Sequence, residues 1–391
     1  MLDSSWYKGR EQTYIKHVVL RRYLQKLAYK RGWHGGTINY VDCFAGPWQH
    51  ATEGLEDTSP FIAIKELREA REELRRRSRP PLGIRCLFIE KHRKSWELLD
   101  SKLRAIEDVE IETIHGDFEV HVQIIRQFAS GGGARPFTFF FIDPTGWTGY
   151  SLDTVTPLLR HQPGEVLINF MTRFITRFVD SDRPEDAGSF NRLFGSAKYR
   201  DHWRNLSGLD REDEIVRAYA ERVREAGKFS FVASSVVLDP LSDRSQFHLI
   251  YATRHIEGLR VFRNDAERPA EKEQQETRWK TQLRREEDRT GQVFLFEQPV
   301  GRDYLDKLRE RYFWKATDRL TMLLEEKHRV PFDDLEAEAL QFPLMSTRVL
   351  KGWLEELKKQ GKVAYEGLAP GARIPQPGKG HVIVWISPPS G

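Results

Sequence analysis

The segment PFTFFFIDP, residues 136–144, is the most hydrophobic strand pattern in this chain. A nearly continuous apolar run of this kind is typical of a strand that is buried on both faces of a sheet. Further strand patterns lie at 38–44, 83–90, 109–117 and 165–171, with helical patterns between them at 59–77, 94–106, 118–129 and 151–160. This alternation predicts a doubly wound α/β domain with a mostly parallel, Rossmann-like sheet.

The pattern changes on both sides of this alternation. Apolar spacing predicts a helix at 11–31 that precedes the first strand. Two late strand patterns, at 229–238 and 247–255, are expected to form an antiparallel edge of the sheet. Residues 180–230 are polar and helical, which indicates a helical insertion. We therefore expect the α/β domain to span residues 1–262.

The last third of the chain has a different organisation. Residues 263–300 are rich in charge and poor in apolar side chains, so they predict a charged linker or a solvated helix. Residues 301–391 predict a second domain, with helices at 318–329, 332–342 and 346–360 and strands at 362–368 and 381–387. Three helices and a β-hairpin of this size are typical of a winged helix-turn-helix domain.

Composition excludes several classes of protein. The 391 residues are 31% charged, 39% hydrophobic and 12% aromatic, with a net charge of +4, which is unlike a disordered polymer. No segment has the roughly 18 apolar residues that a membrane span needs, and the first residues lack the apolar core of a signal peptide. The two cysteines cannot form a disulfide framework, and the histidines have no metal-site spacing. We expect a cytoplasmic protein without membrane or metal.

Acidic residues stand at the ends of four successive strands. They are Asp42, Glu90, Asp117 and Asp143. The carboxyl ends of parallel strands meet at one edge of a sheet, where ligands bind near the topological switch point. A single acidic residue at such a position can equally be a helix cap. Four of them on consecutive strands predict one crevice suited to a nucleoside-bearing cofactor, with Glu90 on the ribose hydroxyls.

The order of these motifs resembles a known family. D-x-F-A-G-P, F-I-E, G-D-F and F-x-D-P follow one another as in class I S-adenosylmethionine-dependent methyltransferases. More narrowly, YVDCFAGPW, TSPFIAIKEL, HGDF and FFIDPTGW resemble the three-Cys-motif partner protein family (TcmP), over roughly residues 10–290. The N-terminal helix with Lys16 and the FHLIYATRH strand fit that family. The C-terminal domain resembles the GMT-like winged helix-turn-helix found in some members.

The resemblance implies a site for S-adenosylmethionine. It assigns cofactor-binding roles to Lys16, Asp42, Phe44, Ala45, Gly46, Glu90, Asp117 and Phe118. Asp42, Phe44 and Gly46 would line the amino-acid end of the cofactor. Glu90 would hold the ribose, while Asp117 would accept a hydrogen bond from the adenine amino group and Phe118 would pack on the ring.

The fourth motif concerns the methyl acceptor. In methyltransferases that act on an amino group of adenine, an Asp-Pro-Pro-aromatic loop meets the exocyclic amine and the aromatic ring stacks on the flipped base. Here the loop contains Asp143, Pro144 and, displaced by one position, Trp147, while the second proline is absent. These three residues are the candidate catalytic set. Alternatively, Asp143 and Pro144 only cap the helix at 151–160.

Basic residues of the C-terminal domain are candidates for nucleic-acid binding. Arg348 and Lys351 fall on its third helix, and Arg373 and Lys379 fall on the expected wing. Winged helices also dock proteins, so both partners remain open.

The leading hypothesis is an enzyme that methylates an exocyclic amino group in nucleic acid. The alternative is a catalytically degenerate methyltransferase-like module that binds a Cys-rich, three-Cys-motif partner protein, DNA, or both. Methylation of a protein or a small molecule by the same fold is a third hypothesis, because fold does not fix substrate.

Overall fold

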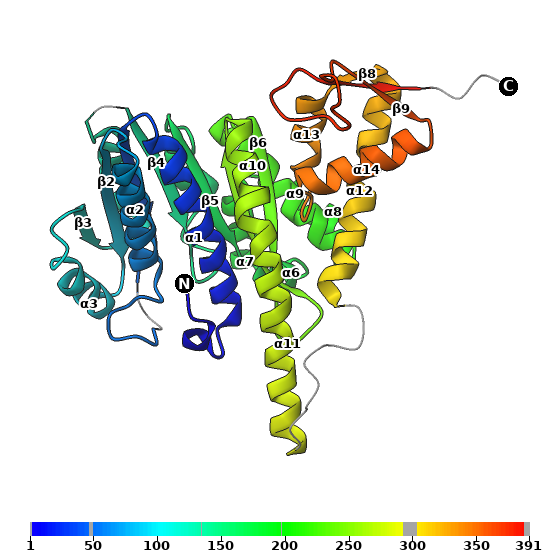
Figure 1. The fold of residues 1–391 in the computed structure, drawn as a ribbon. Helices are drawn as coiled ribbons and strands as arrows, with labels where there is room; N and C mark the ends of the chain where they lie inside the picture. Colours follow the sequence, from blue (N-terminus) through cyan, green and yellow to red (C-terminus); the bar gives the residue numbers. More distant parts are fainter. Residues whose placement is uncertain (1, 47–49, 134, 197, 292–302, 387–391) are drawn as a thin grey trace.

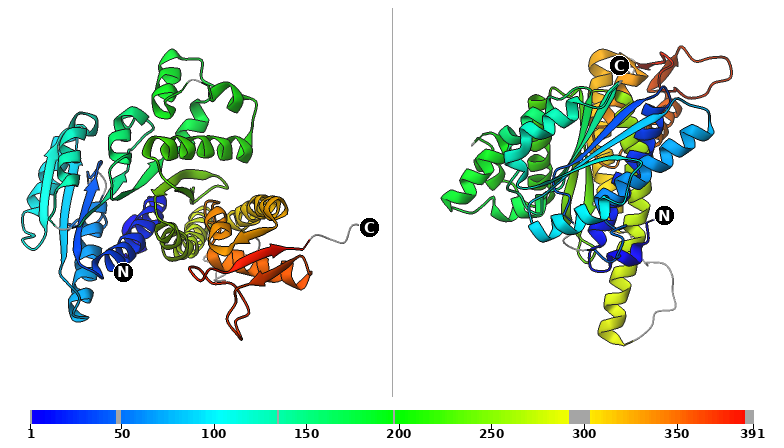
Figure 2. Two further views of the ribbon diagram at one scale, coloured as in Figure 1. Left: turned by 90° about the horizontal axis from the view of Figure 1, so that it is seen from above. Right: turned by 90° about the vertical axis from the view of Figure 1, so that its left-hand side faces the viewer.

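The computed structural model describes residues 2–46, 50–133, 135–196, 198–291 and 303–386 (Figures 1 and 2). A central sheet is covered by helices on both faces, and a smaller C-terminal unit packs beside one end of it. Among the described residues, none of the helices has the length and apolar character needed to cross a membrane.

The sheet has seven strands in the order β3-β2-β1-β4-β5-β7-β6. The strands are β1 Gly36–Asp42, β2 Leu82–Glu90, β3 Glu110–His115, β4 Pro136–Ile142, β5 Gly164–Phe170, β6 Phe231–Leu238 and β7 Ser245–Thr253. The pairs from β3 to β5 are all parallel, whereas β7 pairs antiparallel with both β5 and β6. The expected Rossmann-like fold with a mostly parallel sheet is confirmed. In detail, the antiparallel strand β7 lies between β5 and β6, and β6 is the edge strand.

Helices cover the two faces in separate groups. One face carries α1 Glu11–Gly32, α2 Ser59–Arg76, α3 Arg93–Leu103, α10 Ile256–Arg260, the π-helical turn η2 Val261–Glu267 and α11 Arg268–Thr290, with the short helix η1 Ser4–Tyr7 before α1. The other face carries α4 Phe118–Ser130, α5 Leu152–Leu159, α6 Thr172–Phe178, α7 Pro184–Phe194, α8 Arg200–Arg204 and α9 Gly208–Gly227.

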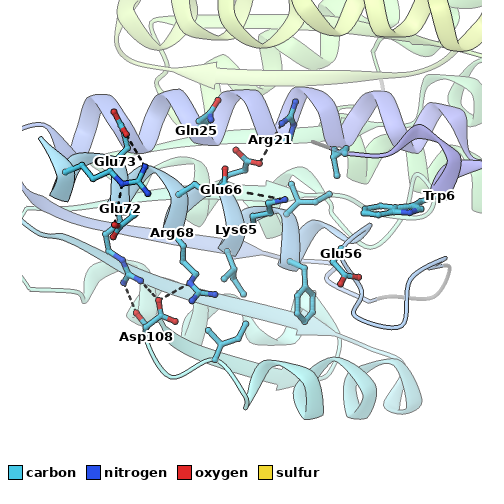
Figure 3. Close-up of a pocket in the computed structure, with 18 residues that line it drawn as sticks. Trp6, Arg21, Gln25, Glu56, Lys65, Glu66, Arg68, Glu72, Glu73 and Asp108 are labelled. Atoms are coloured by element: carbon cyan, nitrogen blue, oxygen red, sulfur yellow. Dashed lines mark hydrogen bonds and ion pairs between the residues drawn. The ribbon is translucent and has the colours of Figure 1, made fainter.

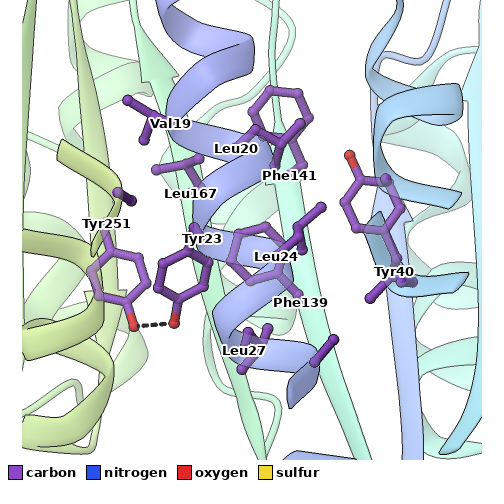
Figure 4. Close-up of a cluster of buried hydrophobic side chains, with 14 of the residues drawn as sticks. Val19, Leu20, Tyr23, Leu24, Leu27, Tyr40, Phe139, Phe141, Leu167 and Tyr251 are labelled. Atoms are coloured by element: carbon purple, nitrogen blue, oxygen red, sulfur yellow. Dashed lines mark hydrogen bonds between the residues drawn. The ribbon is translucent and has the colours of Figure 1, made fainter. Parts of the chain in front are cut away.

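Strand β4 explains this two-faced burial. Phe139 and Phe141 belong to the cluster under α1 and α2, while Phe140 and Ile142 belong to the cluster under α4 and α5. All four side chains are at most 1% exposed. In the close-up of Figure 4, Tyr23 of α1 lies between the ring of Phe139 and that of Tyr251. Each fully buried phenylalanine contributes roughly 1.5–3 kcal/mol, so the run at 137–142 anchors both helical layers to the sheet.

The segment expected to be a solvated helix is only partly solvated. It does form a helix, α11, but this helix packs along α1, and Ala270, Gln274 and Arg278 are at most 3% exposed. The side-chain amide of Gln274 accepts from the backbone N–H of Leu238 at 2.8 Å. The prediction of a solvated segment was wrong for the side of α11 that carries these residues. This side is buried, and its polar side chains form hydrogen bonds with backbone groups of the edge strand β6 and the loop after it.

The C-terminal unit contains three helices and a three-stranded antiparallel sheet. Its elements are α12 Tyr304–Lys327, β8 Arg329–Pro331, α13 Phe332–Ala339, α14 Thr347–Lys359, β9 Val363–Glu366 and β10 Val382–Trp385, with strand order β8-β10-β9. Helix α12 begins well before the expected residue 318. Its first turns pack Leu305, Leu308 and Tyr312 against Val236 and Leu238 of β6, so this helix belongs to both units.

A buried arginine joins the two units. Arg263 is 0% exposed and forms an ion pair with Glu267 at 2.5 Å. Its guanidinium also donates to the carbonyls of Ser234 at 2.9 Å, Leu340 at 2.7 Å and Gln341 at 3.2 Å. Because β6, η2 and the end of α13 all bond to one cation, the position of the C-terminal unit depends on it.

Replacing this arginine should destabilise the protein strongly. In Arg263→Met, the buried Glu267 carboxylate loses its counter-ion, and we expect a loss of about 3–5 kcal/mol in the free energy of unfolding, measured by urea denaturation. Arg68→Met is the control, because Arg68 is an exposed arginine that pairs with Asp108 at the surface, and surface pairs contribute about 0–1 kcal/mol. Equal losses in the two variants would contradict the proposed joint.

Candidate functional site

The strand order places a topological switch point between β1 and β4. The chain leaves this pair in opposite directions, toward β2 and β3 on one side and toward β5 on the other. The loops that follow the strands are tied together there: the Cys43 N–H donates to the Phe141 carbonyl at 3.0 Å and the Ala45 N–H to the Ile89 carbonyl at 2.8 Å. We call this end of β1, β2, β4 and β5 the carboxyl edge. It is where an open α/β sheet binds ligands.

Asp42 anchors the loop after β1. Its side chain is 0% exposed and accepts hydrogen bonds from the Phe44 N–H at 3.1 Å and the Ser59 hydroxyl at 2.7 Å. Burial raises its pKa to about 7. Asp42 was predicted to line the amino-acid end of the cofactor. In the structure its carboxylate is instead enclosed by its own loop and by α2. The site residues predicted from the sequence do not include Ser59. The only signal for it in the sequence is its position at the start of the predicted helix.

Glu90 and Gly46 are in direct contact at the carboxyl edge. A Cβ at Gly46 would lie 2.0 Å from Oε2 of Glu90, so only glycine lets the backbone come this close. Glu90 is 7% exposed, and its Oε1 accepts from the His92 N–H at 2.5 Å. Its Oε2 has no recorded hydrogen-bond partner in the described part of the chain. Ala45 is buried beside them, and the adjoining Pro47 and Trp48 of the predicted motif lie outside the described residues.

Asp117 and Phe118 occupy different environments. Asp117 caps α4 through the Glu119 N–H at 3.2 Å, and the Lys91 ammonium at 2.7 Å lowers the pKa of this carboxyl. Its side chain is about one third exposed, so an oxygen remains accessible. The Phe118 ring, in contrast, is 2% exposed and packs on the Phe44 ring at 5.4 Å. The Phe118 ring belongs to the core, while Phe44 is only partly buried, so contact of Phe118 with an adenine ring stays a prediction.

Asp143 lies at the centre of a polar triad. The Lys16 ammonium of α1 contacts its Oδ2 at 2.5 Å, and the Asn169 amide of β5 donates to its Oδ1 at 2.7 Å. Asn169 is 3% exposed, and its own Oδ1 is buried with no hydrogen-bond partner in the described part of the chain. Sequence reasoning missed Asn169, although a lone amide in the apolar run VLINF is the signal that would have found it.

The rest of the fourth motif packs inward. Pro144 is buried, and the Trp147 ring lies 5.8 Å from Phe178 and 4.8 Å from Phe190, centroid to centroid. Trp147 is only partly buried: the Phe178 ring stacks on it and the Phe190 ring is tilted against it, and its role as a stacking platform stays a prediction. The alternative role of Asp143 and Pro144 as a cap is wrong: Ser151 caps α5, accepting from the Thr154 N–H at 3.2 Å.

The four candidate nucleic-acid residues lie on the C-terminal unit. Arg348, Arg373 and Lys379 are exposed. Lys351 is half-buried, donates to Gln376 at 2.7 Å and lies over the Phe332 ring, and burial lowers its pKa. This lysine therefore holds the loop between β9 and β10.

A groove of about 940 Å³ runs along α1 and α2, away from these groups (Figure 3). It contains none of the predicted site residues, and its arginines Arg68 and Arg71 both pair with Asp108. The candidate site is therefore the carboxyl edge and not this groove.

No protein-family model matches the chain, and no curated protein matches its sequence. Among solved structures, it is similar to a protein from Legionella pneumophila str. Philadelphia 1 at 12% identity and a TM-score of 0.34, over 62% of this chain and 85% of that chain. It is similar to the O-methyltransferase TomG from Streptomyces achromogenes in complex with SAM at 14% identity and a TM-score of 0.30, over 60% and 79%. It is also similar to loganic acid methyltransferase with SAH at 9% identity and a TM-score of 0.29, over 76% and 94%. These TM-scores are low, so the fold rests on the strand order described above.

The buried Asp42 makes stability depend on pH. Its pKa of about 7 in the folded chain exceeds the ordinary value of 3.8, so the folded state binds more protons between about pH 4 and pH 7. Stability is therefore lost as pH rises through this window. Asp42→Asn does not titrate, so its free energy of unfolding relative to the wild type should rise by a few kcal/mol from pH 4 to pH 8, measured by urea denaturation at each pH. A difference that stays flat with pH would exclude this effect.

Proposed function

We propose that the α/β domain is a methyltransferase that uses S-adenosylmethionine and methylates an amino group. The observation that carries this proposal is the Glu90 carboxylate, which is nearly buried at the end of β2 and whose Oε2, beside the backbone of Gly46, has no hydrogen-bond partner among the described residues. A carboxylate so placed, one strand from the switch point, is suited to the two hydroxyls of a ribose.

The residues at the carboxyl edge fit the proposed cofactor. Oε2 of Glu90 can accept from a ribose hydroxyl, and the accessible oxygen of Asp117 can accept from an adenine amino group. The missing Cβ at Gly46 lets the Glu90 carboxylate lie directly against the loop after β1. Asp42 holds the turn in which Gly46 lies and needs no contact with the cofactor itself.

The bound cofactor would supply an electrophilic methyl group on a sulfonium. The chain supplies the place for the amine. Asp143, together with the unpartnered Oδ1 of Asn169, offers oxygens that accept the N–H hydrogens and so orient the nitrogen lone pair. The Lys16 ammonium beside Asp143 disfavours a second cation, which keeps the amine neutral and nucleophilic. Methyl transfer to this nitrogen would release a proton to water, and Asp143 and Asn169 would hold the nitrogen in place.

For the acceptor we propose an exocyclic amino group in nucleic acid, as in an enzyme of the three-Cys-motif partner type. The Asp143-Pro144 pair supports this acceptor. So does the C-terminal unit, whose order of helices and strands is compatible with a winged helix that places a polymer, with Arg348, Arg373 and Lys379 exposed on it.

A second candidate is a module without catalysis that binds a Cys-rich partner protein. One observation favours it: each Asp143 oxygen has a partner within the chain, and the Trp147 ring is packed against α6 and α7. An acceptor amine would then have to compete with Lys16 and Asn169 for the Asp143 carboxylate oxygens.

Cofactor binding is tested by calorimetry. Titration with S-adenosylmethionine and S-adenosylhomocysteine should give micromolar dissociation constants for the wild type, and Glu90→Ala should lose binding by a factor of ten or more, because two hydrogen bonds to a charged group contribute about 1.5–3 kcal/mol each. Asp153→Ala, which removes an exposed carboxylate of α5, is the control. A wild type that gives neither heat nor thermal stabilisation would refute the cofactor assignment.

Methyl transfer is tested with a labelled donor and a pool of single-stranded DNA and RNA oligonucleotides that contain unmodified adenine and cytosine. Asp143→Ala should lower transfer about 100-fold or more, since the amine loses its orienting carboxylate, while its affinity for the donor stays within two-fold of the wild type. Full activity in Asp143→Ala would show that the role given to Asp143 is wrong. Donor binding without any transfer by the wild type would favour the second candidate.

A further inference from the structure

A second cavity, of about 440 Å³, lies between α6, α9 and the start of β7. It is lined by Arg173, Thr176 and Arg177 of α6, Glu212 of α9, and Arg244 and Ser245 at the start of β7. We call it the arginine cavity. None of its residues belongs to the site described above.

The topology places the arginine cavity at the carboxyl edge. Helix α6 begins two residues after the end of β5, which carries Asn169 of the triad. Strand β7 runs antiparallel to β5 and begins at Ser245, so its first residues lie where β5 ends. Two residues into β7, the Phe247 ring lies 6.0 Å from the Lys16 ammonium, which contacts Asp143. The cavity and the triad therefore lie at the same end of β5, the triad on the face covered by α1 and the cavity on the face covered by α6 and α9.

Positive charge prevails in the arginine cavity. Arg177 has no carboxylate partner recorded in the described ranges, and its one recorded contact is the Phe178 ring. Arg173 donates to Gln246 at 2.9 Å and lies 3.6 Å from Asp239, which also pairs with Arg244 at 3.2 Å. The remaining acidic group, Glu212, contacts His248 at 2.9 Å. Among the described residues, the three guanidinium groups thus have two nearby carboxylates: Asp239, which pairs with two of them, and Glu212, which is bonded to His248.

The arginine cavity also holds a polar group that lacks a partner. Ser245 is 5% exposed, and its hydroxyl has no hydrogen-bond partner among the residues that the structure describes. A buried hydroxyl without a partner costs free energy unless something satisfies it. An anion held by the arginines would accept from this hydroxyl. Guanidinium groups bind phosphate oxygens with two parallel hydrogen bonds, which suits several arginines around one phosphate.

We propose that the arginine cavity binds a backbone phosphate of a single-stranded nucleic acid whose base enters the Asp143 triad. This proposal rests on the proposed function and narrows its acceptor. The cavity is too small for a folded domain and matches one phosphate with its sugar. Binding the phosphate next to the reacting base fixes the base in register, which is how contacts to the backbone position a polymer.

The test is binding of a fluorescein-labelled 12-nucleotide single strand, as DNA and as RNA, to the full chain without methyl donor, measured by anisotropy. Arg173→Gln/Arg177→Gln should weaken binding about ten-fold or more and reduce the slope of log affinity against log salt by about one to two, because each phosphate contact releases a counterion. The control, Arg183→Gln/Arg192→Gln, removes two exposed arginines at α7 that do not line the cavity and should lose less than two-fold.

Further arms keep the proposal separate from the cofactor assignment. Ser245→Ala, which removes a single hydroxyl, should weaken oligonucleotide binding several-fold, and donor titrations should be the same in all variants. Equal losses in cavity and control variants, no binding by the wild type, or equal affinity for a polyglutamate peptide or for inorganic phosphate would overturn the proposal. A wild type that does not bind the methyl donor would instead contradict the proposed methyltransferase function, and the oligonucleotide-binding result could still be interpreted.

Discussion

Burial of the central strands on both faces is the constraint on which the rest of the structure depends. Because Phe139 and Phe141 fill one helical layer and Phe140 and Ile142 fill the other, β4 has no side left for polar chemistry. Polar groups within the sheet are costly unless they are paired, and Glu165 meets this condition through Tyr23 and Thr253. Reactive groups are therefore confined to the strand ends, and the carboxyl edge collects them.

The N-terminal helix α1 serves the core and the site together. Its apolar side covers β4 and β5, while Lys16 on the same helix reaches Asp143 (Figure 4 shows the apolar contacts). Two residues that precede α1 hold its first turns in place. The Tyr7 hydroxyl contacts His17 of α1 at 3.0 Å, and Arg10 pairs with Asp57, which precedes α2, at 2.7 Å. Burial lowers the pKa of His17, which keeps this ring neutral among the nearby cations. These contacts connect Asp57 to the start of α1. The same helix carries Lys16, so the contact with Asp143 depends on how α1 packs against the sheet.

Helix α9 connects the candidate site to the C-terminal unit. Glu212 faces the arginine cavity and contacts His248, while the next residue, Asp213, binds Arg311 at 2.7 Å and the Tyr312 hydroxyl at 2.8 Å on α12. With the joint at Arg263 on the opposite side, α12 and α13 are held at two places. A polymer that contacts the arginine cavity would thus meet a C-terminal unit in a fixed orientation.

The alternation of apolar runs and the acidic residues after them determined the sheet, its helical layers and the edge that holds Glu90, Asp117 and Asp143, because periodicity and strand ends are local properties of a chain. Only the tertiary structure decided which of these groups face outward. Asp42 and Phe118 are enclosed and Trp147 packs against α6 and α7, since burial depends on elements distant in sequence. The same holds for Asn169, the arginine cavity and the buried face of α11: each needs partners from several strands and helices, and no single stretch of sequence contains them.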